Sequence, residues 1–316
     1  MQVELFNAAK YRNSRREGDD VALILPGQLY AVCDGATDPL GTVVGGIGAG
    51  RVAALAMARA VQRLSLTPEA LTAPIDEILA TLSRDLAAAT RPMGLEIPPS
   101  TTLALAIDLG EDWRFITLGD SGIRLNGTEV LRHEKIIDDV SAAARVQYFL
   151  DRLAVQDEED QAEVEAREGM LLGLDLACKK GRLSAARLED IIAQTVAETE
   201  LEDHAQEVEA FLRAGIRSQY KLGNLAGHPL GFDTLNGTLP CRGEWQDRTV
   251  PKAKISSIEI FSDGYCALPP NIGVAAFEAS FAEVEALDYH KTGAFRSVKG
   301  STKAQVFDDR TILAIT

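Results

Sequence analysis

The sequence lacks several features that define large classes of protein. No apolar run approaches the roughly 20 residues needed to span a bilayer, so no membrane segment is expected. The 32 basic residues are outnumbered by 47 acidic ones, and the net charge of −15 argues against a surface for nucleic acid or anionic lipid. The four cysteines form no CxxC pair, which predicts neither a disulfide framework nor a zinc knuckle and favours a cytoplasmic location.

Common catalytic and cofactor motifs are also missing. There is no Walker loop and no Gly-x-Ser-x-Gly. Gly119-Asp120-Ser121 is similar to a serine-protease nucleophile segment, but all four histidines follow Ser121, which is the wrong order. Gly48-x-Gly50-x-x-Ala53 matches a dinucleotide loop, yet no second strand ending in an acid follows about 20 residues later. We favour a loop that leads into a helix. A titration with NAD would test the alternative, which is a dinucleotide-binding loop.

The apolar patterning predicts a mixed fold that begins with strands. A hairpin is expected at 21–34, around Pro26-Gly27, and an antiparallel meander at 101–131, with Asn126-Gly127 as a type I′ turn. Further elements are expected in this order: helices at about 51–64 and 74–90, a strand at 255–261, a helix at 275–287 and a strand at 310–315.

Composition changes in residues 134–220, which we call the helical segment. Positions 134–210 carry 20 acidic and 8 basic side chains, a balance of −12. Ala, Leu, Glu and Gln recur there at helical spacing, which predicts three or four helices. The acidic run 157–160 is read as a solvated helix start or loop rather than as a binding site.

One pattern recurs along the chain: an apolar β-run ends in Asp, followed by Gly, Ser or Asp. It occurs at Asp34, Asp120, Asp263 and Asp308. A single case is explained by an Asx turn. Four such ends from one sheet system can converge, and converged carboxylates repel one another unless a cation lies between them. Oxygen ligands without His or Cys favour Mg²⁺ or Mn²⁺ over zinc.

At this point the sequence resembles the metal-dependent PP2C-type (PPM) protein phosphatases, from about residue 12 to the end. The family's ordered landmarks match these segments in turn: Arg15-Arg-Glu-Gly-Asp19-Asp20, Val32-Cys33-Asp34-Gly35, Gly119-Asp120-Ser121, Ser262-Asp263-Gly264 and Asp308-Asp309-Arg310-Thr311. The resemblance implies an α+β fold, an αββα sandwich of two antiparallel sheets flanked by helices. It places the phosphatase domain at 1–133 and 221–316, with 134–220 as an inserted acidic helical subdomain.

The resemblance also implies an activity and a site. The expected reaction is hydrolysis of phosphoserine or phosphothreonine on a protein substrate by water activated between two Mn²⁺ or Mg²⁺ ions. Asp34, the Gly35 carbonyl, Asp263 and Asp308 would hold the two ions, and Asp20 would lie in or next to their ligand shell. Arg15 would clamp the phosphate, and Asp120 with Asp263 would hold a third, weaker ion.

Two departures from the family pattern leave alternatives open. Ala36 follows the Asp-Gly pair where the family often has a His, which removes a general acid. Residues 134–220 do not match the usual segment, so a protein partner at the helical segment is an expectation. The alternative function is therefore a catalytically weak phosphatase-fold protein that binds a partner, and a small-molecule phosphatase is a further one. His228, in a Gly-rich loop, is read as structural.

Overall fold

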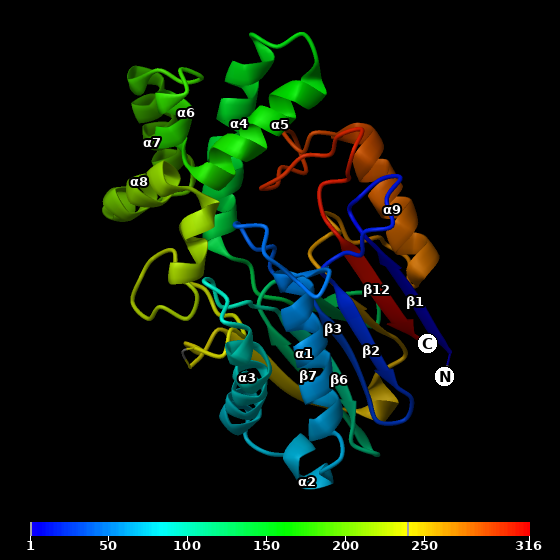
Figure 1. The fold of residues 1–316 in the computed structure, drawn as a ribbon. Helices are drawn as coiled ribbons and strands as arrows, with labels where there is room; N and C mark the ends of the chain where they lie inside the picture. The colour runs from blue at the N-terminus through cyan, green and yellow to red at the C-terminus, as the bar shows by residue number, and fades with distance from the viewer. Residues whose placement is uncertain (1, 239) are drawn as a thin grey trace.

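A computed structural model describes residues 2–238 and 240–316 and shows four layers: helices, sheet, sheet, helix (Figure 1). The first sheet contains, in spatial order, β1 (Val3–Ala8), β12 (Arg310–Ile315), β11 (Ile258–Phe261), β8 (Gly122–Leu125) and β9 (Glu129–Leu131). The second contains β10 (Trp245–Pro251), β7 (Asp112–Leu118), β6 (Leu103–Asp108), β3 (Leu29–Cys33) and β2 (Val21–Leu25). All strand pairs in both sheets are antiparallel. The predicted fold class is confirmed.

Strand β3 shows how one apolar run builds two layers. Leu29, Ala31 and Cys33 belong to the core beneath the helices of the second sheet, while Tyr30 and Val32 lie in the core between the two sheets. Successive side chains of a strand point to opposite faces. Because both faces are covered, all five residues are buried, and the strand is apolar throughout rather than alternating.

Helices cover the outer faces of the sandwich. Helix α1 contacts β2, β3 and α3, and α9 contacts β1 and β12. The bounds of these helices are α1 (Ala49–Leu64), α2 (Pro68–Leu71), α3 (Ile75–Thr90) and α9 (Val274–Leu287). A small hairpin, β4 (Val43–Val44) with β5 (Ile47–Gly48), precedes α1. Short 3₁₀ helices occur at η1 (Arg91–Met93), η2 (Glu202–His204), η3 (Ile216–Lys221) and η4 (Lys252–Lys254).

The helical segment has a hydrophobic core of its own and gathers above the sheets in Figure 1. Its α-helices are α4 (Ile136–Leu153), α5 (Glu159–Leu172), α6 (Leu174–Lys179), α7 (Ala185–Glu198) and α8 (Ala205–Ala214). The expectation of three or four helices was too low, because Gly173, with φ of 95°, separates α5 from α6. The boundaries 134–220 for an inserted unit stay a prediction. In the described ranges, no helix has both the length and the apolar character to cross a membrane.

A buried ion pair fastens the helical segment to the loop after α9. Arg145 of α4 pairs with Glu163 of α5, and both side chains are fully buried. Arg145 also donates to the carbonyl oxygens of His290 and Ser297, at 2.9 and 2.8 Å, and Glu163 accepts from the backbone N–H of Gly300. The position of α4 is therefore tied to residues 290–300.

Two expectations about strands need correction. The predicted meander at 101–131 is wrong as one sheet: β6 and β7 pair in the second sheet, whereas β8 and β9 pair in the first. The chain crosses between sheets at residues 119–121, which contain the left-handed Gly119. Strands β1 and β10 were not predicted. Both are edge strands with polar, partly exposed residues, so they lack the apolar pattern of a central strand.

The Arg145–Glu163 pair generates a stability prediction. Replacing Arg145 by Met leaves a buried carboxylate without its partner, so we expect the free energy of unfolding to fall by about 3–5 kcal/mol. The matched control is Arg187→Met, whose ion pair with Asp151 is about one-third exposed and should contribute about 0–1 kcal/mol. Denaturant unfolding monitored by circular dichroism measures both. Equal losses in the two variants would contradict the assignment.

Candidate metal centre

Strand register brings the acidic motifs to one edge of the sandwich. In the second sheet Val21 pairs with Cys33 and Leu103 with Leu118, so the residues before β2 and after β3 and β7 lie at the same end. In the first sheet Phe261 pairs with both Gly122 and Ile312. The ends of β11, β8 and β12 therefore meet there too. This geometry explains why carboxylates far apart in the sequence converge.

Three of the predicted carboxylates form a compact group. Asp34, Asp120 and Asp263 each offer an oxygen, and these oxygens all lie within 4.8 Å of one another. Asp120 is buried, and the other two are half-buried. Such a group of oxygen donors suits a hard divalent cation.

Hydrogen bonds to the backbone carbonyl of Asp34 fix the position of this residue. Its carbonyl oxygen accepts hydrogen bonds from the N–H of Thr102 at 2.9 Å and from the hydroxyl of Thr101 at 2.8 Å. The Thr102 hydroxyl in turn lies 2.6 Å from the hydroxyl of Ser121, which follows Asp120. Thr101 and Thr102 therefore link the turn that carries Asp34 to the turn that carries Asp120.

The glycines of the Asp-Gly pairs are required by close backbone approaches. A Cβ at Gly35 would lie 2.1 Å from the carbonyl oxygen of Gly50, and one at Gly264 would lie 1.9 Å from that of Asp309. Within the described residues, the Gly35 carbonyl oxygen accepts no hydrogen bond. It therefore has no hydrogen-bond donor there that would compete with a metal ion.

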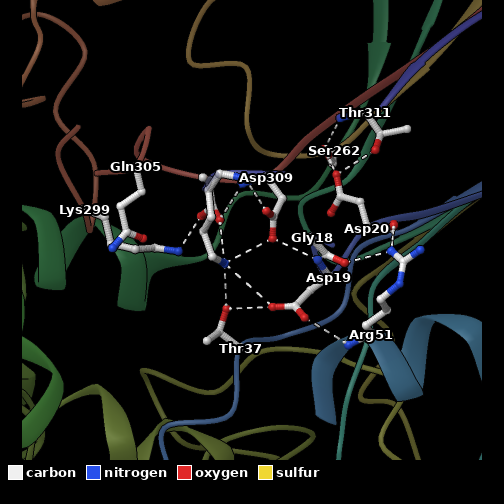
Figure 2. A network of polar contacts seen from close by, with 12 residues as sticks. Gly18, Asp19, Asp20, Thr37, Arg51, Ser262, Lys299, Gln305, Asp309 and Thr311 are labelled. Carbon is white, nitrogen blue, oxygen red and sulfur yellow. Dashed lines mark hydrogen bonds and ion pairs between the residues drawn. The ribbon is translucent and has the colours of Figure 1, made fainter. Parts of the chain in front are cut away.

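Asp20 directly precedes β2, and its side chain is bound by residues of the first sheet (Figure 2). Its Oδ2 accepts hydrogen bonds from Ser262 at 2.6 Å and from Thr311 at 2.8 Å. Its Oδ1 is buried and has no hydrogen-bond partner among the described residues. Burial, followed by the charges of Asp309 and Asp308, raises the pKa of Asp20 to about 6.

Asp308 is engaged by two lysines. Its Oδ2 lies 2.6 Å from the Lys299 ammonium, and its Oδ1 lies 3.6 Å from that of Lys10. Burial would raise the pKa of Asp308, but Lys299 and Lys10 outweigh it and lower the pKa to about 2. The carboxylate is ionised and already has cationic partners, so a metal ion has to share it with them.

Lys10 was missed by the sequence analysis. Its buried ammonium lies 3.1 Å from Asp309 and 3.7 Å from Asp19, and it donates to the Thr37 hydroxyl at 3.1 Å. Figure 2 shows Asp19, Asp309 and Thr37 joined in this network. Burial lowers the pKa of Lys10, but the surrounding carboxylates raise it more, so the lysine stays charged. Lys10 and Asp309 are 299 positions apart, and nothing in the local sequence signals the contact.

Arg15, unlike the buried and half-buried carboxylates, lies at the surface. Its side chain is exposed, and within residues 2–238 and 240–316 it makes no hydrogen bond or ion pair. The structure therefore leaves this guanidinium free at the surface.

Burial, together with mutual repulsion, sets the electrostatics of the carboxylate group. Burial, followed by Asp263 and Asp20, raises the pKa of Asp34 well above its ordinary value. Burial, followed by Asp308 and Asp120, raises the pKa of Asp263 to about 8. Asp120 differs: burial would raise its pKa, but Lys135 lowers it. Burial and the neighbouring carboxylates therefore shift Asp34 and Asp263 toward protonation, and a divalent cation within the group would oppose that shift.

Comparisons with known proteins give structural neighbours only. No family model and no curated protein matches the chain. The chain is similar to the serine/threonine phosphatase Stp1 from Staphylococcus aureus, with 11% identity, a TM-score of 0.46 and coverage of 99% of this chain and 93% of that one. For the Mycobacterium tuberculosis serine/threonine phosphatase PstP/Ppp, the identity is 15%, the TM-score 0.40, and the coverage 99% and 97%.

A third neighbour is the catalytic domain of the phosphatase PstP in complex with 2 manganese ions, at 14% identity, a TM-score of 0.43, and coverage of 99% and 97%. The structural neighbours are thus bacterial PP2C-type serine/threonine phosphatases, the class that the sequence motifs resemble. With TM-scores below 0.5, the argument for function comes from the chain's own residues.

The raised pKa of Asp263 generates a prediction about pH. Its folded-state pKa of about 8 lies above the unfolded value, which is about 3.9. Its contribution to stability is therefore full below pH 4 and is lost as the pH rises through 8. We expect the melting temperature of metal-free protein to fall over this range, and to fall less in Asp263→Asn. Asp203→Asn, at an exposed carboxylate in η2, is the control. Identical pH dependence in Asp263→Asn and wild type would show that the pKa of Asp263 is not raised in the folded protein.

Proposed function

We propose that the protein is a metal-dependent phosphomonoester hydrolase that removes phosphate from phosphoserine or phosphothreonine in protein substrates. The observation that carries the proposal is the convergence of Asp34, Asp120 and Asp263 at one sheet edge. The ordered motifs that resemble the PP2C-type family supply the reaction class. The proposed substrate follows from that resemblance and from the exposed Arg15, whose fork can bind a phosphate in a bidentate manner.

The residues fit the Mn²⁺ or Mg²⁺ ions that the proposal requires. The donors are all oxygen, the Oδ1 atoms of Asp20 and Asp120 are buried without a hydrogen-bond partner in the described ranges, and the Gly35 carbonyl is free. We propose Asp34, Gly35 and Asp263 as ligands, with Asp20, Asp120 and Asp308 alongside. When bound, two such ions lower the pKa of a water molecule and neutralise charge on the phosphoryl group.

The chain's own groups prepare this site. Thr101 and Thr102 fix the backbone of Asp34, and Ser262 with Thr311 fixes Asp20. Lys10 joins the segment before β2 to the turn before β12 through Asp19 and Asp309. These contacts fix the Asp34 backbone and the Asp20 carboxylate before any ion binds, which reduces the reorganisation that binding would need.

One observation favours the alternative of a catalytically weak, partner-binding protein. Lys299 and Lys10 already occupy Asp308, which the resemblance assigns to the metal. The two functions differ in one measurable property, because only the hydrolase needs Mn²⁺ to turn over a phosphate ester.

The metal requirement generates the principal test of the proposed function. Asp34→Asn and Asp263→Asn should each lower Mn²⁺-stimulated hydrolysis of p-nitrophenyl phosphate by more than about 100-fold, because each removes a ligand rather than a ligand's partner. Asp203→Asn is the control. The metal-free Asn variants should melt at a higher temperature than wild type, since repulsion is relieved, which separates loss of metal from loss of folding. Hydrolysis that persists in both variants, or in EDTA, would show that the proposal is wrong.

The exposed Ala36 beside Gly35 generates a second prediction about substrates. Serine and threonine are poor leaving groups, and a positioned general acid contributes about 10²–10⁴-fold to their departure. His228, which lies in a Gly-rich loop, accepts a hydrogen bond from the N–H of Leu230 in the same loop. We therefore expect wild type to prefer aryl phosphates over a phosphothreonine peptide.

Rates for both substrates in wild type, Ala36→His and His228→Ala measure this preference. Ala36→His should raise peptide hydrolysis selectively, and His228→Ala should change neither rate. Equal rates for the two substrates in wild type, with no effect of Ala36→His, would contradict the leaving-group argument.

A further inference from the structure

Lys135 brings a cation from the helical segment into the carboxylate group. It directly precedes α4, its side chain is 14% exposed, and its ammonium lies 2.6 Å from Asp120 Oδ2 and 3.3 Å from Asp138 Oδ2. A lysine is unfavourable at the N-terminal end of a helix, where the backbone dipole is positive. Its position is therefore explained by the two carboxylates and not by helix stability.

Asp120 belongs to both the lysine and the proposed metal site. One of its oxygens binds Lys135, while Oδ1 is buried and has no hydrogen-bond partner among the described residues. The same side chain offers an oxygen within 4.8 Å of those of Asp34 and Asp263. A divalent cation in this group and the Lys135 ammonium then share one carboxylate, and like charges at such separations repel.

We propose that the Lys135 ammonium competes with divalent metal for the Asp120 carboxylate, so that the first residue before α4 weakens metal binding at the centre. This inference rests on the metal site of the proposed function. In this inference the Lys135 ammonium takes the place of the third, weaker ion that the resemblance implied at Asp120 and Asp263.

The surroundings of Lys135 hold the ammonium in place. Asp138 binds it from the first turn of α4, and the Phe232 ring lies 5.6 Å from Nζ. Helix α4 is itself fixed by the buried Arg145. Metal affinity at the sheet edge is thereby coupled to the position of α4.

A competing role for Lys135 predicts the opposite sign. If the lysine only oriented Asp120 as a ligand, its removal would weaken metal binding, as is usual for partners of metal ligands. The ammonium carries the same sign of charge as the metal and contacts the shared carboxylate directly. Repulsion therefore outweighs orientation, and removal of the charge should tighten binding.

Titration of purified, metal-free protein with Mn²⁺, monitored by calorimetry and by the EPR signal of free Mn²⁺, tests the proposal. Lys135→Met should bind Mn²⁺ tighter by about tenfold or more, the scale on which partners of metal ligands act. Lys135→Gln should do the same, which covers the case in which the Met variant does not fold. Lys135→Arg keeps the charge and should bind like wild type.

The control for net charge is Lys254→Met, an exposed lysine that precedes β11, whereas Asp263 follows that strand. It should leave Mn²⁺ affinity unchanged. Wild-type binding that depends on Asp34 tests the proposed function, whereas the ratio of neutral variant to wild type tests the competition. Unchanged or weaker binding in a folded neutral variant overturns the inference, even if wild type binds Mn²⁺ as proposed.

Discussion

Repulsion between carboxylates at one edge of the sandwich is the constraint on which the rest of the site depends. Strand register forces Asp34, Asp120 and Asp263 together, and burial removes the water that would screen them. Lys135 balances part of this charge at Asp120, and Lys10 and Lys299 pair with the neighbouring Asp308. The balance is incomplete, as the raised pKa values of Asp34 and Asp263 show, and a divalent cation would complete it.

The helical segment contributes to this balance from two directions. Lys135, before α4, contacts Asp120, while Arg145 and Glu163 hold the loop that ends near Lys299, the partner of Asp308. Through these contacts the helical segment affects the charges at the carboxylate group and is not only a possible recognition unit. A protein partner that displaced α4 would alter the cations on both sides of the carboxylate group.

The parts of the structure that follow from local sequence were predictable, and the parts made by distant contacts were not. β3 is a continuous apolar run and α1 is rich in Ala, Leu and Met, and the Asp-Gly pairs mark strand ends where backbones approach too closely for a side chain. The edge strands β1 and β10 have polar residues and no such signal. Lys10 lies 299 positions from Asp309, so no local pattern in the sequence signals their contact. The sandwich was expected from the resemblance of the ordered motifs, whereas the lysines that contact its carboxylates were not expected.

The most direct test of the account is a crystal structure of the protein grown with Mn²⁺, with anomalous diffraction recorded at the manganese absorption edge. We expect anomalous density between Asp34 and Asp263, in contact with the Gly35 carbonyl, and the Lys135 ammonium still on Asp120. Density elsewhere, or an empty carboxylate group in crystals that hold Mn²⁺ at other sites, would contradict it.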